Sequence, residues 1–132
     1  MFRTTKVGLV LMVIACLADG VRAGPPPAVK GEEYVQVVVG QFGRTVNDDK
    51  KPLYYFLDYK REKERNYESQ GFELNIEWTQ KTAKGDVKVT GAQLNQLWGA
   101  PKEETKAWIR RETKTGKVLE VFHPDATVGW EK

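Results

Sequence analysis

Short runs of β-branched and aromatic residues, divided by turn-forming residues, recur through most of the chain and favour an antiparallel β fold. The runs lie at residues 33–46, 53–59, 72–78, 87–90, 105–112 and 117–123. Runs of this length and composition are typical of strands, and the short segments between most of them suit hairpin connections. No segment supplies the crossover helix that neighbouring parallel strands would need.

Three of the runs carry more detail. In residues 33–46 the odd-numbered valines at 35–39 and Phe42 are expected on opposite faces, and Gly40 and Gly43 predict a bulge or a sharp bend. In residues 72–78 apolar and polar residues alternate strictly, which predicts one continuous strand with one buried face. Residues 53–59 are apolar on both faces, so they form either a central strand or a strand that keeps one face for a partner.

One short helix is expected at residues 91–98. Thr90 can cap it, Leu94, Leu97 and Trp98 recur at helical spacing, and Gly99 is expected to end it. Residues 105–123 follow as a strand, a glycine turn and a second strand. The element order predicts a mostly β (α+β) fold: a single small domain with an antiparallel five- to six-stranded meander or OB-like barrel and one short helix near residues 91–98.

The first 23 residues have the features of an export signal. Arg3 and Lys6 precede an uncharged apolar run at residues 7–18, and small residues follow at residues 21–23, where a signal peptidase would cut. The run is shorter than the roughly 20 residues that span a bilayer. We therefore predict a signal peptide at 1–23, a proline-rich linker at 24–31 and a β-rich domain at 32–132, exported to the periplasm, the cell envelope or the medium.

A second cleavage point stays open. The stretch from Val13 to Cys16 is an acceptable lipobox, and Cys16 is the only cysteine in the chain. Cleavage after Ala23 would release a soluble domain, whereas cleavage before Cys16 would leave a lipid-anchored protein. This anchor is the only membrane contact that the sequence predicts.

Charge and cysteine content exclude several functions. The signal holds three of the 21 basic and one of the 18 acidic residues, which leaves 18 basic and 17 acidic residues from Gly24 onwards. With a net charge near +1, the exported part does not have the excess of basic residues that a protein binding duplex nucleic acid carries. Without a cysteine after residue 16, the exported part can form no disulfide scaffold and no cysteine-ligated metal site.

The residue types of a catalytic centre are also scarce. His123 is the only histidine, and Ser69, the only serine, lies in a charged segment. Glu73 and Glu77 fall on the polar side of an expected strand, where solvated carboxylates are common. We therefore expect no enzyme activity, no catalytic residue, no cofactor and no metal ion.

Aromatic and arginine residues supply the binding hypothesis. Tyrosine, tryptophan and arginine are enriched at protein interfaces, where one side chain offers both apolar area and a polar group. The candidates that are not clearly core residues are Tyr54, Tyr59, Trp108, Arg110, Arg111 and Trp130. The alternative is that they cover the rim of a small core.

Residues 89–122 resemble part of the small outer-membrane lipoproteins of the SmpA/OmlA type. Leu94 and Leu97 match the apolar positions of a short helix, residues 99–101 match its Gly-x-Pro end, Trp108 matches an aromatic strand and Gly116 a turn. Trp98 stands where that family has leucine, and the upstream part of that family is helical. The resemblance implies an envelope lipoprotein that assists the assembly of outer-membrane proteins.

Together these features predict an exported, non-enzymatic binding or structural protein whose partner is another protein or an envelope component. One alternative is a lipid-anchored assembly lipoprotein acylated at Cys16. The other is a small secreted effector or inhibitor that acts on another protein.

Overall fold

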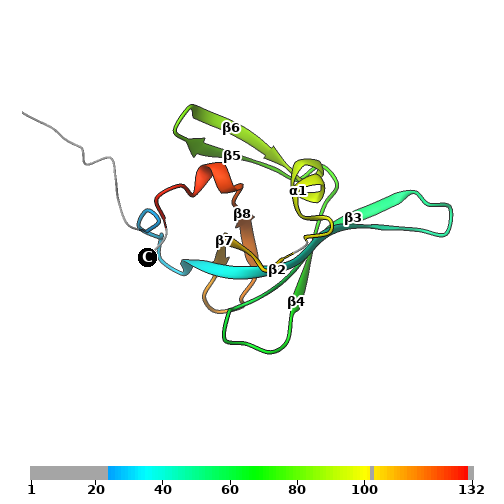
Figure 1. The fold of residues 1–132 in the computed structure, drawn as a ribbon, viewed down its shortest axis with the longest axis horizontal. Coiled ribbons are helices and arrows are strands. Elements are labelled where there is room, and N and C mark those ends of the chain that lie inside the picture. Colours follow the sequence, from blue (N-terminus) through cyan, green and yellow to red (C-terminus); the bar gives the residue numbers. More distant parts are fainter. Residues whose placement is uncertain (1–23, 102, 131–132) are drawn as a thin grey trace, which may run out of the picture. The chain divides into compact units, whose positions relative to one another are not determined.

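Five antiparallel strands form one curled sheet, and two further strands form a separate hairpin (Figure 1). The computed structural model describes residues 24–101 and 103–130. Every helix and strand in this part lies in one compact unit, Pro27–Thr127, and the described residues 24–26 and 128–130 belong to a second unit. The predicted signal peptide and Cys16 lie outside the described residues.

The sheet is a half-barrel of five antiparallel strands. Its order is β4-β3-β2-β7-β8, so a three-stranded meander is followed by a fourth strand that pairs with the first. The elements are β2 (Glu32–Val46), β3 (Pro52–Lys60), β4 (Glu68–Phe72), β5 (Glu77–Thr82), β6 (Gly85–Thr90), α1 (Gly91–Trp98), β7 (Thr105–Glu112), β8 (Val118–Val121) and the short 3-10 helix η1 (Pro124–Ala126). The predicted fold class is confirmed, and the β5–β6 hairpin is inserted between the third sheet strand and the helix.

β2 is the longest strand, and it bends where a bulge was predicted. Its register against β3 shifts between Val39 and Gln41, so Gly40 is the extra residue. Because a bulge reverses the alternation of side chains, Phe42 joins Val37 and Val39 in one core cluster. The prediction that Phe42 lies on the opposite face from these valines was therefore wrong.

The alternating stretch at residues 72–78 is not one strand. β4 ends at Phe72, the Ile76 N–H donates to the Glu73 carbonyl at 3.0 Å to close a turn, and β5 begins at Glu77. Phe72 and Trp78 still meet edge to face, with ring centroids 5.7 Å apart, but they do so from two different strands. Phe72 is buried and Trp78 is partly buried, as the alternation predicts, but Leu74 in the turn is exposed.

The helix begins as predicted. The Thr90 hydroxyl accepts from the Gln93 N–H, and the Gln93 side chain accepts from the Thr90 N–H, which makes a capping box. Leu94 and Trp98 are buried, but Leu97, which was expected to be buried with them, is exposed. Within the described ranges, no helix is both long and apolar enough to cross a membrane.

Side chains close the gap between the two edge strands, β4 and β8. The Gln70 amide of β4 donates to the Val118 carbonyl and accepts from the Val118 N–H, both at 2.7 Å. Trp78 of β5 donates through Nε1 to the Leu119 carbonyl at 3.0 Å, and Gln80 of β5 reaches further along the same edge. These bonds give β8 hydrogen-bond partners in place of a neighbouring strand.

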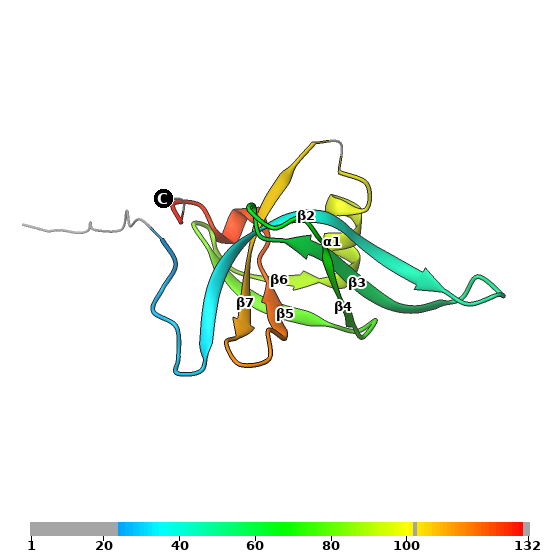
Figure 2. The same cartoon turned by 90° about the horizontal axis from the view of Figure 1, so that it is seen from below.

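The β2–β3 hairpin extends beyond the rest of this unit, as Figures 1 and 2 both show. The inner part of β3 is covered on both edges, because Tyr55 to Tyr59 pair with both β2 and β4. In the outer part, Pro52 and Tyr54 pair with β2 alone, and a register shift leaves Leu53 as an extra residue without a partner. The candidate binding site lies at this step in the sheet, where β3 extends past the end of β4.

Candidate binding site

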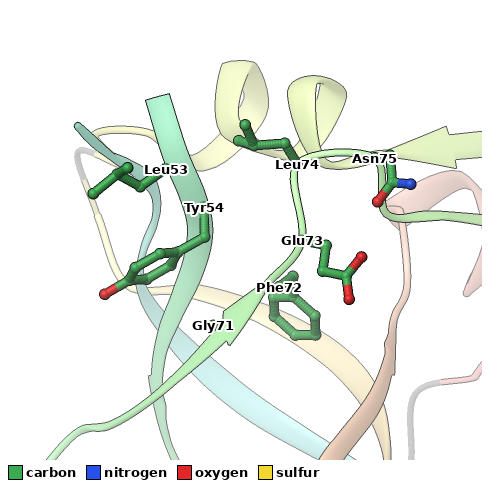
Figure 3. A pocket seen from close by; sticks show the side chains of 7 residues that line it. All are labelled: Leu53, Tyr54, Gly71, Phe72, Glu73, Leu74 and Asn75. Atoms are coloured by element: carbon green, nitrogen blue, oxygen red, sulfur yellow. The ribbon is translucent and has the colours of Figure 1, made fainter. Parts of the chain in front are cut away.

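A pocket of about 630 Å³ opens where β4 ends and β3 continues. Figure 3 shows Leu53 and Tyr54 of β3 on one side of it and Glu73 and Asn75 on the other. The lining residues are Leu53, Tyr54, Gly71, Phe72, Glu73, Leu74 and Asn75. An apolar concavity with a few polar groups is the usual composition of a ligand pocket.

The walls of the pocket are positioned by the core beneath it. Phe72 is buried and stacks on Phe42, with ring centroids 6.0 Å apart, so the end of β4 is fixed in place. Gly71 leaves room for the Tyr54 ring, since a Cβ at Gly71 would lie 3.2 Å from Tyr54 Cδ1. Leu53 and Tyr54 keep 52% and 44% of their surface exposed. The pocket therefore combines an anchored floor with an accessible apolar rim.

Three polar side chains at the pocket are uncommitted. Within the described part of the chain, the side chains of Tyr54, Glu73 and Asn75 make no hydrogen bond or ion pair. Two other asparagines have structural roles: Asn47 accepts from two backbone N–H groups of its turn, and Asn95 donates to the Phe42 carbonyl. Uncommitted donors and acceptors beside apolar surface are available to orient a ligand.

Of the predicted contact residues, Tyr54 alone lies at this pocket. Tyr59 and Trp108 are only 4% and 5% exposed, so they offer no surface to a partner in this structure. Trp130 is half-buried in the second unit, and Cys16 lies outside the described residues. The predicted aromatic patch is therefore not assembled, because Tyr59 is part of the core cluster and Trp108, on the opposite face of β7 from the core residues Ala107 and Ile109, is buried as well.

The two arginines are tied to carboxylates of neighbouring strands. Arg110 bonds Glu32 at 2.8 Å and Glu120 at 3.1 Å, and Arg111 bonds Glu33 at 2.8 Å. Burial on its own lowers the pKa of Arg110, but the hydrogen bonds and charges of Glu32 and Glu120 outweigh it and raise that pKa. These pairs link β2, β7 and β8, so they are part of the sheet rather than free contact groups.

The described residues bring together no cluster of metal-ligating side chains. No group of three or more histidine, cysteine, aspartate or glutamate side chains gathers within residues 24–101 and 103–130. Nδ1 of His123, the one histidine, accepts from the Asp125 N–H at 3.0 Å, so this side chain caps η1. This pairing gives His123 a structural role.

Leu53, Glu73, Leu74 and Asn75 were not predicted as site residues. The signal in the sequence was the apolar pair Leu53-Tyr54 directly after Pro52, at the start of a strand that is apolar on both faces. Residues 73–75 carried no such signal, because they were assigned to the interior of a strand.

Comparison of the chain with protein-family models, curated proteins and solved structures found no match.

Proposed function

We propose that this protein is an exported, non-enzymatic binding protein whose ligand occupies the pocket at the step between β3 and β4. The observation that carries the proposal is the pocket itself, where exposed Leu53 and Tyr54 lie beside uncommitted polar side chains. Burying an exposed leucine or tyrosine side chain contributes roughly 1.5–3 kcal/mol. Contacts with these two residues and a few oriented hydrogen bonds would have to outweigh the entropic cost of association.

Export is the second part of the proposal, and it is supported by the basic start, apolar run and small residues of the first 23 positions. The intact mass of the protein from its native host tests it. A mass that starts at Gly24 supports a soluble exported product, and a mass that starts at acylated Cys16 supports the lipid-anchored form. An uncleaved chain would refute export through this signal.

The binding proposal is tested with two probe collections, a displayed library of random nine-residue peptides and a glycan array. The purified exported protein is compared with Tyr54→Ser and Leu74→Ser variants, which remove apolar contacts at exposed pocket positions. Val87→Ser is the matched control, because Val87 is similarly exposed but lies on the β5–β6 hairpin.

Ligands that bind the parent protein and Val87→Ser but not the pocket variants support the proposal. No binding in either collection, or binding that both pocket variants leave unchanged, refutes it.

A further inference from the structure

We infer that the pocket binds a basic side chain, a lysine or arginine of a partner protein, with its cationic group beside Glu73 and its apolar stem against Tyr54 and Leu74. The inference rests on the proposed function and specifies the ligand class. It begins from the charge of the seven lining residues, among which Glu73 is the only charged one and none is basic. The pocket is therefore suited to a cation and unsuited to an anion.

Glu73 is available to pair with such a charge. Within the described part of the chain its carboxylate makes no hydrogen bond or ion pair, whereas Arg110 holds both Glu32 and Glu120. Glu73 is also exposed, so its side chain can turn towards a ligand without breaking a hydrogen bond of this part of the fold. A cation that enters the pocket therefore has no partner to displace there.

Tyr54 lies at the same end of the sheet as Glu73. Tyr55 pairs with Phe72 in the β3–β4 ladder; Tyr54 precedes this pair on β3, and Glu73 follows it where β4 has ended (Figure 3). Neighbouring strands lie about 4.8 Å apart, so one ligand side chain can contact residues of both. The face of a tyrosine ring attracts a cation, and Tyr54 is 44% exposed. The ring and the carboxylate therefore favour the same kind of charge.

The apolar residues of the rim suit the stem of a basic side chain. Leu53 and Leu74 line the pocket and are 52% and 41% exposed. Lysine and arginine lay their methylene groups along apolar surface while the charged end stays in water. Asn75 adds an amide that can hydrogen-bond the backbone of the same ligand residue. The pocket thus offers a contact for each part of a basic residue.

A neutral glycan fits the pocket less well. It could stack on Tyr54 and hydrogen-bond Asn75, but the charge of Glu73 and the two exposed leucines would have no function in binding it. A wholly apolar ligand would leave the three polar side chains of the pocket without a partner. A basic side chain uses the charged, aromatic and apolar residues together.

Two small probes that differ in one ammonium group test the inference. N-acetyl-lysine methylamide and N-acetyl-norleucine methylamide share a four-carbon stem, and only the first is charged. Each is titrated into the isotope-labelled exported protein, and binding is followed by the NMR shifts of the amides that line the pocket. An exposed ion pair and an exposed cation–π contact together predict about five- to tenfold tighter binding of the lysine compound.

Equal affinities of the two compounds would overturn the inference. So would the absence of any shift at the pocket with the lysine compound at its highest soluble concentration.

Pentylamine distinguishes a side chain from a free amine. It carries an ammonium group on an apolar stem but has no backbone amide to bond Asn75. We expect it to bind about two- to threefold more weakly than the lysine compound. Binding as tight as that of the lysine compound would assign the pocket to free amines and overturn the partner side chain.

Two variants test where the preference for the charge arises. Glu73→Gln and Tyr54→Leu each remove one attraction for a cation, so each should lower the preference for the lysine compound about two- to threefold. The double variant should bind both compounds equally. Glu104→Gln removes a carboxylate outside the pocket and should keep the full preference. A preference that survives in Glu73→Gln, or is lost in Glu104→Gln, rejects Glu73 as the partner of the cation.

The outcomes for inference and function separate. Glycans or neutral peptides that bind the pocket of a protein without preference for the lysine compound would overturn the inference and leave the proposed function intact. Absence of pocket-dependent ligands from both collections, together with no binding of the small probes, would overturn both.

Discussion

The strongest stability prediction concerns Gln80, whose side chain is 2% exposed and is the one polar side chain that the described part of the core buries. Its amide donates to the Val121 carbonyl at 2.8 Å and to Glu120 Oε2 at 3.2 Å. Its carbonyl oxygen accepts from the His123 N–H at 3.0 Å. Gln80 therefore hydrogen-bonds two backbone groups, the Val121 carbonyl and the His123 N–H, that a strand beside β8 would otherwise pair with.

Gln80→Leu keeps the size and removes these bonds. Glu120 retains Arg110, but the Val121 carbonyl and the His123 N–H lose their partner. Each buried backbone group left without a partner costs about 1–3 kcal/mol. After a small gain from the more apolar side chain, we expect the free energy of unfolding to fall by about 2–4 kcal/mol. For a domain of this size that corresponds to a loss of roughly 10–20 °C in Tm.

Urea and thermal unfolding followed by circular dichroism measure this loss. Gln36→Leu is the matched control, because Gln36 is an exposed strand residue whose side chain makes no hydrogen bond in the described part of the chain, and we expect it within about 0.5 kcal/mol of the parent. If Gln80→Leu is no less stable than Gln36→Leu, side-chain bonds do not close this edge and the argument fails.

Three further predictions follow from the same structure. Thr90→Ala removes the hydroxyl that caps α1, so the free energy of unfolding should fall by about 1 kcal/mol in urea titrations, and an unchanged midpoint would contradict the capping box. The pKa of Tyr59 is raised, first by burial and then by the Glu68 carboxylate, against an opposing effect of Arg111. Because the unfolded chain loses this proton near pH 10 and the folded chain holds it longer, stability from Tyr59 is complete below pH 10 and is lost as pH rises through the folded pKa. Tyr59→Phe should therefore lose less stability than the parent in unfolding titrations above about pH 10, and identical alkaline profiles would argue against the shift. Cys16→Ser should release the protein from the membrane fraction if the lipid-anchored form exists, and unchanged partitioning on fractionation would exclude that form.

Local chemistry made parts of the fold predictable. The cap at Thr90 and the turn between β7 and β8 depend on residues near one another in the chain, and both were found where expected. Of the two glycines expected to cause a bulge or bend in β2, Gly40 lies at a register shift and Gly43 pairs regularly. Gly99 is a partial exception, since it ends the helix in a right-handed conformation rather than the left-handed one typical of a glycine cap.

Long-range pairing decided the features that were missed. Residues 72–78 alternate as a strand should, yet the chain turns at Glu73 because β4 and β5 belong to different sheets. Tyr59 and Trp108 are residue types common at interfaces, but Tyr59 lies in the core cluster and Trp108 is buried on the opposite face of the sheet from Ala107 and Ile109. The pocket has the same origin, since it exists because β4 stops three residues before the end of β3.

The edges of the sheet show why that early stop matters. An uncovered strand edge can pair with another chain and cause aggregation. Here the edge of β8 is covered by side chains that make the hydrogen bonds a neighbouring strand would make: Gln70, Trp78 and Gln80. By contrast, the side chains of Leu53 and Tyr54 stay exposed at the pocket. The polar side chains there, of Tyr54, Glu73 and Asn75, make no hydrogen bond or ion pair in the described part of the protein. A continuation of β4 by three residues would cover the outer part of β3 in the same way, but β4 ends at Phe72. The pocket at this step is therefore left accessible, which is why we propose it as the ligand site.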